Sequence, residues 1–277
     1  MGKFRFRRRK QRQRVEREIP IRSIVPNLVT LMAAASGVTS IRFSCSQDWK
    51  KAAVFILLAA MFDGLDGRVA RMLRATSKLG AELDSLSDFV SFGVAPGILL
   101  YFWIMQVVEI GSMAYRFRGC FWALALFYAM CCAFRLARFN IMLEMPTQSY
   151  WKHFFMGLPA PGGAGLVILP IAWQMHESET MLQNPWVGSI CLFVCGLLMA
   201  SRFPTLSLKH LTIPPKWFLL VLLVTIFILG FLIAQFWVTL VFIGLMYYLS
   251  IPICGAVFCR LRARETAAQA KADGEKG

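Results

Sequence analysis

The sequence predicts an all-α polytopic membrane protein with about eight transmembrane helices. Hydrophobic residues make up 57% of the 277 residues and charged residues only 16%, whereas a soluble domain carries about 25% charge. Several segments of about 20 residues, the length that a helix needs to cross the bilayer core, contain no charge. The 30 lysines and arginines also concentrate in alternate loops. This composition excludes a soluble globular domain, a disordered chain and a disulfide scaffold.

The expected helices follow the apolar segments. Their bounds, in chain order, are 23–42, 52–74, 82–108, 118–139, 154–175, 184–202, 217–235 and 237–259. The uncharged residues 52–62 are too few to span a bilayer alone, so the second helix must continue through the charged residues 63–74. Residues 217–259 carry no charge over 43 positions, which is enough for two spans with a tight turn near Gln235.

The loop charges predict the orientation. With the N-terminus in the cytoplasm, the cytoplasmic segments contain 25 of the 30 lysines and arginines: 1–22, 68–78, 135–153, 202–216 and 260–277. The segments on the opposite side contain the other five: 42–51, 109–118 and 176–185. We therefore expect a multi-pass protein of the cell's inner (cytoplasmic) membrane with both termini inside.

Four aspartates carry the main chemical signal. Five of the 15 acidic residues lie between positions 63 and 88, although a charge inside an apolar helix costs about 2.5–3.5 kcal/mol. Asp63 and Asp66 are three residues apart on the second expected helix, so they share one helix face. Asp84 and Asp88, four residues apart on the third helix, also share a face. Because the linker is short, the helices should be antiparallel neighbours and the four carboxylates should converge at their cytoplasmic end.

Clustered carboxylates repel one another unless they are protonated or bind cations. Oxygen ligands without His or Cys suit two hard divalent ions, Mg²⁺ or Mn²⁺, and paired ions are typical of displacement at phosphorus. Gly67 and Ala70 leave room for a bulky ligand on the same face, while Arg71 and Ser77 can donate to a phosphate. The alternative is an ordinary charge network with Arg68, Arg71, Arg74 and Lys78.

The segment 63–88 resembles the signature of the CDP-alcohol phosphatidyltransferase family. That signature reads D-x-x-D-G-x-x-A-R, eight residues, G, three residues, D, three residues, D, and every fixed position is present. The resemblance implies a homodimeric helical bundle with its active site at the cytoplasmic face. It also implies metal-dependent transfer of a phosphatidyl group from a CDP-linked lipid to an alcohol, with release of CMP.

The same resemblance implies roles for individual residues. Asp63, Asp66, Asp84 and Asp88 would bind the metals, and Asp88 would also be the catalytic general base. Gly67, Arg71 and Ser77 would contact the diphosphate of the CDP-lipid. Asn27 and Thr30 belong to a segment that resembles the family's first helix, which faces the nucleotide; the alternative is that they cap and pack that helix.

The acceptor is predicted from residues 135–140. The sequence Arg135-Leu-Ala-Arg138-Phe-Asn140 resembles a motif of the serine-using members of the family. A guanidinium group binds a carboxylate through two parallel hydrogen bonds, so a free amino acid suits the site. The expected substrates are CDP-diacylglycerol and L-serine, with glycerol 3-phosphate, inositol phosphate or choline as alternative acceptors. A cation-coupled transporter, the alternative from another class, would require paired repeats and acids near the bilayer midplane.

Three regions are expected. Residues 23–259 form the transmembrane catalytic domain, and residues 260–277 form a solvated cytoplasmic tail. Residues 1–22 carry ten lysines and arginines, which favours contact with anionic membrane lipids over nucleic-acid binding. The eight cysteines include no C-x-x-C and only three histidines occur, so a zinc site is not expected.

Overall fold

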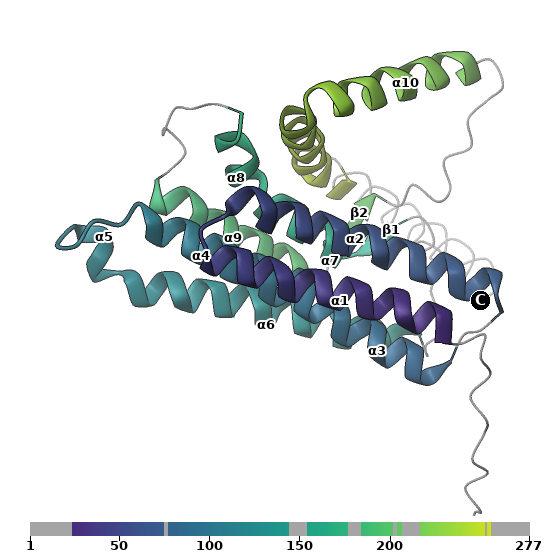
Figure 1. Ribbon diagram of the computed structural model, residues 1–277, viewed down its shortest axis with the longest axis horizontal. Helices are drawn as coiled ribbons and strands as arrows, with labels where there is room; N and C mark the ends of the chain where they lie inside the picture. The colour runs from purple at the N-terminus through teal and green to yellow at the C-terminus, as the bar shows by residue number, and fades with distance from the viewer. Residues whose placement is uncertain are drawn as a thin grey trace, which may run out of the picture.

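The computed structural model describes residues 24–74, 77–143, 154–176, 184–201, 204–206, 217–252 and 254–255. Within these residues the protein is a bundle of helices with one small sheet (Figure 1). The expected basic segment 1–22 and the C-terminal tail 260–277 lie outside the described residues.

Between residues 24 and 143 the described chain is mainly helical. The helices are α1 (Ile24–Cys45), α2 (Trp49–Met72), α3 (Lys78–Asp88), the π-helical turn η2 (Phe89–Val94), α4 (Ala95–Gln106), α5 (Met113–Arg116) and α6 (Arg118–Leu143). Because α3, η2 and α4 follow one another without a break, they form a single helix of 29 residues, Lys78–Gln106. Figure 1 shows this helix running side by side with α1, α2 and α6.

The second half of the chain is more interrupted. It contains β1 (Phe154–Met156), α7 (Ala160–Val167), α8 (Leu169–Gln174), α9 (Pro185–Ala200), β2 (Pro204–Leu206), α10 (Phe218–Ala234) and a last helix, Phe236–Pro252. The backbone breaks at Gln235, where the sequence predicts a tight turn. Helix α10 stands apart from the bundle in Figure 1, and its uncharged side chains are exposed, as suits contact with lipid.

The prediction of one helix over 154–175 is wrong at its start and in its middle. Residues Phe154–Met156 form β1, which pairs antiparallel with β2, Phe154 opposite Leu206. Gly157 then adopts a φ of +79°, a left-handed conformation that glycine tolerates. Pro159 has extended backbone, so the helix begins only at Ala160. Pro170 lacks the N–H that a continuous helix needs, which separates α7 from α8.

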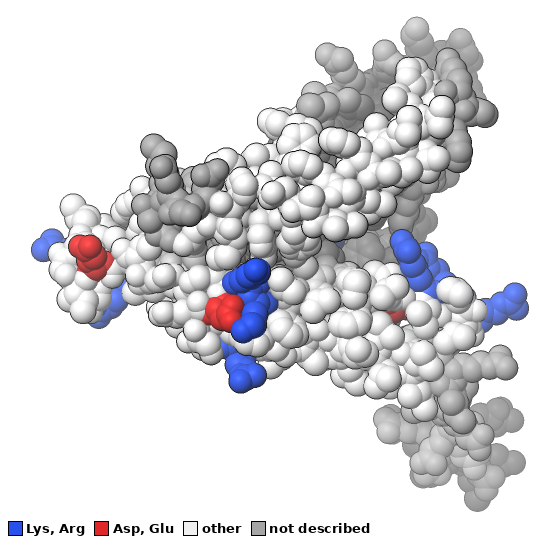
Figure 2. Space-filling model, turned by 45° about the horizontal axis from the view of Figure 1, so that its top comes forward, with Lys and Arg blue, Asp and Glu red and all other residues white. Residues whose placement is uncertain are grey.

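Among the described residues, three helices are long and apolar enough to cross a membrane: Ile24–Cys45, Lys78–Gln106 and Arg118–Met142. Three shorter helices are also apolar: Pro185–Ala200, Leu219–Ala234 and Phe236–Pro252. Helix α2 is 24 residues long, but it does not count among the apolar helices because its second half contains charged residues. On the face shown in Figure 2, charged side chains form a few small groups and most of the surface is uncharged. The protein is therefore membrane-embedded.

Small side chains let α1 approach its neighbours closely. Ser40 on α1 is fully buried and donates to the carbonyl of Ala52 on α2 at 2.8 Å. A side chain at Gly37 would place its Cβ only 2.7 Å from Cα of Ser91, so the backbones of α1 and η2 are in contact there. Small residues at helix contacts are typical of membrane proteins. The close packing of α1 against α2 and η2 fixes the helices that carry the predicted aspartates.

Candidate active site

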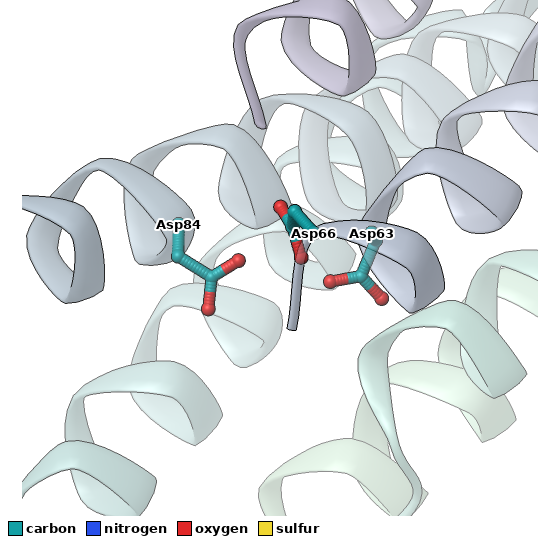
Figure 3. Close-up of side chains that lie close together, drawn as sticks. All are labelled: Asp63, Asp66 and Asp84. Carbon is teal, nitrogen blue, oxygen red and sulfur yellow. The ribbon is translucent and has the colours of Figure 1, made fainter. Parts of the chain in front are cut away.

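The structure brings together three of the four predicted metal ligands. Asp63 and Asp66 extend from α2 toward Asp84 on α3, as Figure 3 shows. One carboxylate oxygen from each lies within 4.8 Å of the other two. Asp66 is 5% exposed, while Asp63 and Asp84 are half-buried. Asp63 and Asp66 share one face of α2, so their convergence with Asp84 follows from the antiparallel packing of the two helices.

Asp88 extends the cluster by one turn of α3. Its side chain is half-buried and lies within hydrogen-bonding distance of the Asp63 carboxyl. Two ionised carboxylates in contact repel each other strongly, so a proton or a cation must lie between them. Asp63 therefore connects Asp88 to the three-carboxylate group.

Thr30 holds Asp66 from the side of α1. Its hydroxyl lies 2.7 Å from Oδ2 of Asp66 and 3.1 Å from the carbonyl oxygen of Pro26, so one proton is shared between two acceptors. The carbonyl of Thr30 in turn accepts a hydrogen bond of 3.0 Å from the Ser87 hydroxyl. Thr30, predicted as a nucleotide contact, thus also orients a predicted metal ligand.

A pocket of about 170 Å³ adjoins the aspartates. Its lining comes from α1, α2 and the start of α3: Pro26, Asn27, Thr30, Asp66, Gly67, Ala70, Ser77, Gly80, Ala81 and Asp84. Four predicted ligand-binding residues, Asn27, Thr30, Gly67 and Ser77, are therefore at one pocket. Apart from its own helix backbone, nothing in the described part of the chain lies within 4 Å of the position that a Cβ of Gly67 would take, so this glycine keeps the pocket open.

Two further contacts shape the rim of this pocket. Ser77 caps α3, because its hydroxyl accepts a hydrogen bond of 3.0 Å from the N–H of Gly80, and its own proton remains available as a donor. A Cβ at Gly80 would lie 3.0 Å from Oδ1 of Asn27, so glycine permits Asn27 to approach. Arg71 donates from Nε to the carbonyl of Gly67 at 2.9 Å, which places its guanidinium beside the pocket.

The three predicted acceptor-site residues on α6 have different surroundings. Arg135 is half-buried and interacts electrostatically with Asp63 and Asp88. Its Nε is buried without a hydrogen-bond partner among the described residues. Arg138 instead donates two hydrogen bonds of 2.9 Å to the carbonyls of Ala200 and Ser201, at the end of α9.

Asn140 connects two helices. Its side-chain amide donates to the hydroxyl of Ser85 at 2.9 Å and so joins α6 to α3 next to Asp84. Ser85 and Ser87 carry no signal of their own in the sequence, because serine at helix positions is common. Their hydrogen bonds to α1 and α6 become apparent only when these two helices are packed against α3 in the structure.

The alternative of an ordinary charge network receives no support within the described part of the chain. The one ion pair there joins Lys51 to Asp48 at 2.7 Å, in the loop between α1 and α2 and the first turn of α2. Arg68, Arg74 and Lys78 are exposed. Arg71 is exposed as well, so within the described residues the clustered aspartates form no ion pair with any of these four cations.

Comparison with known proteins identifies the family. The sequence matches the CDP-alcohol phosphatidyltransferase family over residues 23–200, so the chain belongs to that family and the resemblance seen in its motif is confirmed. The match covers all the aspartates and the residues of α6 described above.

Several curated relatives have the same name, CDP-diacylglycerol–serine O-phosphatidyltransferase. The protein of Mycobacterium leprae is 39% identical over 197 residues, which cover 70% of this chain and 62% of the relative. The protein of Helicobacter pylori strain J99 is 35% identical over 202 residues, covering 72% of this chain and 79% of the relative. The protein of Saccharomyces cerevisiae is 41% identical over 123 residues, covering 43% and 40%. The chain thus matches less than two thirds of the length of the mycobacterial relative.

Proposed function

We propose that the protein transfers the phosphatidyl group of CDP-diacylglycerol to L-serine, giving phosphatidylserine and CMP. The convergence of Asp63, Asp66 and Asp84 beside an open pocket, with Asp88 in contact with Asp63, is the observation that carries the proposal. The names of the relatives support serine as the acceptor.

The donor set fits divalent cations. All the converging ligands are carboxylate oxygens, which hard ions prefer, and no described histidine or cysteine belongs to the group. We assign Asp63, Asp66, Asp84 and Asp88 as ligands of two ions, Mg²⁺ or Mn²⁺. Such ions, when bound, neutralise negative charge on the diphosphate and on the departing phosphate.

The nucleotide part of the CDP-lipid would occupy the pocket between α1, α2 and α3. Asn27 and Ser77 present polar atoms at its rim, and Gly67 leaves space for the diphosphate. Arg71, held beside Gly67, supplies guanidinium donors for a phosphate. These residues bind and orient the substrate so that its phosphorus faces the aspartates.

Asp88 would act as the general base. It removes the proton of the serine hydroxyl while the serine oxygen forms a bond to the phosphorus that carries diacylglycerol. The bond from that phosphorus to the oxygen of CMP breaks, and CMP departs with the electron pair. Asp88 interacts electrostatically with Arg135, so its position fits an acceptor bound between these two residues.

Arg135 is the residue that we assign to the serine carboxylate. A buried guanidinium nitrogen without a partner is costly, and an anionic ligand would satisfy it. The sequence predicts the same role for Arg138 and includes Asn140 in the same acceptor motif. The hydrogen bonds of Arg138 to α9 and of Asn140 to α3 instead favour a role in positioning α6.

The remaining expectations belong to the same proposal. We propose eight membrane spans: the three long apolar helices, the three shorter apolar helices, α2 and the interrupted α7–α8 region. Both termini and the aspartates lie on the cytoplasmic side of the inner membrane, and residues 1–22 contact anionic lipids. As the family resemblance implies, the protein acts as a homodimer whose catalytic domain is 23–259.

An acceptor screen tests the proposal. Protein purified in detergent receives CDP-diacylglycerol, Mn²⁺ and one acceptor at a time: L-serine, glycerol 3-phosphate, inositol phosphate or choline. We expect L-serine to be the one acceptor of the four that supports CMP release, and we expect Asp88→Asn to reduce that release by about 10²–10⁴-fold. Release with another acceptor but not with serine would contradict the assignment of the acceptor. No release with any acceptor would contradict the transferase function itself.

A further inference from the structure

We propose that Ser87 and Ser91 are positioning residues that hold Asp84 and Asp88 in place by binding their helix to the backbone of α1. This proposal rests on the proposed function, because it concerns the same cluster of aspartates. Neither serine lines the pocket, and neither is needed for a direct contact with substrate.

The two serines form a pair of buried hydrogen bonds between helices. The hydroxyl of Ser87 donates to the carbonyl of Thr30 at 3.0 Å, and that of Ser91 donates to the carbonyl of Ala33 at 3.1 Å. Ser87 is 5% exposed and Ser91 is fully buried. The donors are four residues apart and the acceptors three, so both pairs lie on facing sides of the two helices. Two such bonds hold the helix that carries Ser87 and Ser91 in one rotational orientation and at one position along α1.

Thr30 connects this pair of bonds to the aspartates of α2. Its carbonyl accepts from Ser87, which is next to Asp88 in the chain, and its hydroxyl donates to Asp66. The ligands on α2 and α3 are therefore both held by one residue of α1. A shift of α3 along α1 would change the distance between Asp66 and Asp84.

The backbone at the second serine is also specialised. Asp88 is the last residue of α3, and the π-helical turn η2 begins directly after it. A π turn holds more residues than an α turn, and such turns are frequent at functional sites. Because Gly37 has no side chain, the backbone of Ser91 can approach α1 closely enough to form its bond. The turn and the glycine together determine where the helix bearing Asp84 and Asp88 meets α1.

Electrostatics explain why the aspartates need this support. When they are ionised and no cation is bound, the carboxylates on α2 and α3 repel one another and favour separation of the two helices. The serine bonds oppose that separation and keep the ligands close before a cation arrives. Mutation of a residue that orients a metal ligand commonly lowers metal affinity by about 10–100-fold. Loss of the bonds should therefore weaken cation binding.

Ser40 provides a matched control. It is also fully buried, and its hydroxyl also donates across helices, from α1 to the carbonyl of Ala52 on α2. That bond lies toward the opposite end of the helix pair from the aspartates. Ser40→Ala therefore removes an equivalent bond without disturbing the cluster.

The test compares Mn²⁺ binding by full-length wild type, Ser87→Ala, Ser91→Ala and Ser40→Ala in detergent. Free Mn²⁺ is measured by electron paramagnetic resonance, and thermal unfolding is recorded for each protein. We expect the Mn²⁺ dissociation constant to rise about tenfold in Ser87→Ala and by a smaller factor in Ser91→Ala. Ser40→Ala should keep the wild-type constant, even if its unfolding temperature falls as much. Ser87→Thr, which retains the hydroxyl, should restore the affinity.

Wild-type Mn²⁺ affinity in both Ser87→Ala and Ser91→Ala would overturn the proposal, and so would an equal loss in Ser40→Ala. If Ser87→Ala does not fold, Ser91→Ala decides alone, because it breaks the bond farther from the aspartates. The CMP assay separates this proposal from the proposed function. A wild type that binds Mn²⁺ but releases no CMP contradicts the function only.

Discussion

Helix α2 has an aspartate at its start and two in its second half, and the two regions use them differently. Asp48 precedes the helix, accepts a hydrogen bond of 3.1 Å from the N–H of Lys51 and pairs with the Lys51 side chain at 2.7 Å. Asp63 and Asp66 instead face another carboxylate, Asp84. The first arrangement satisfies an acidic group within the protein. The second brings acidic groups together without such a partner, and protons or a bound cation can neutralise them, as the proposed metal site requires.

The largest expected effect comes from the last aspartate of the cluster. Asp88→Asn should reduce CMP release with serine by about 10²–10⁴-fold, because an amide cannot accept the serine proton. Binding of CDP-diacylglycerol should persist. Asp48→Asn is the control from the other region of α2, and it should retain full turnover. Near-normal turnover in Asp88→Asn would show that this residue is not the base.

Two arginines on α6 allow a substrate-binding role to be compared with a structural role. Arg135→Ala should raise the KM for serine by about 10–100-fold and leave the KM for CDP-diacylglycerol nearly unchanged, because a charged hydrogen bond to the carboxylate is lost. Arg138→Ala should mainly lower the unfolding temperature, since it frees the carbonyls at the end of α9. If Arg138→Ala shows the larger rise in serine KM, the two roles are reversed.

Two glycines on α2 test the position of the pocket. Among the described residues, a Cβ at Gly64 or at Gly67 would meet nothing within 4 Å beyond its own helix backbone, but of the two only Gly67 lines the pocket. Gly67→Leu should raise the KM for CDP-diacylglycerol about tenfold, because the new side chain occupies substrate space. Gly64→Leu, on the same helix, should have little effect. Equal KM values for the two variants would place the nucleotide elsewhere.

The smallest effect is expected at the start of α2. The hydrogen bonds from Lys51 lower the pKa of Asp48, so its stabilising contribution is present above the ordinary aspartate pKa and is lost as the pH falls through the lowered value. Asp48→Ala should therefore lower the unfolding temperature slightly at neutral pH and not at strongly acidic pH. Turnover should stay at the wild-type level. A large loss of turnover would contradict the separation between the two regions of α2.

The sequence predicted the structure best where the residues of a single helix form the informative pattern, such as an apolar stretch or a regular spacing of aspartates. Apolar length predicted α1 and α6, and the spacing of the aspartates predicted that Asp63, Asp66 and Asp84 would meet. Uncharged residues 154–175 also predicted a helix, but Gly157 and Pro170 interrupt it. A count of charges cannot detect the backbone conformation that such residues impose.

Contacts between distant residues were beyond the sequence. Arg138 reaches a carbonyl 62 positions away, and Ser87 reaches one 57 positions away. Two arginines spaced three residues apart look equivalent along a helix, so only the packing of α9 against α6 separates their surroundings. The assignment of the individual residues to substrates and metals stays a prediction.

The most direct measurement is anomalous X-ray diffraction from crystals of the protein soaked in Mn²⁺. We predict Mn²⁺ peaks between α2 and α3, within bonding distance of Asp63, Asp66 and Asp84 and with Asp88 completing the site. Mn²⁺ peaks confined to other parts of the protein, or aspartates that point away from one another with no peak between them, would contradict a metal-dependent active site at this position.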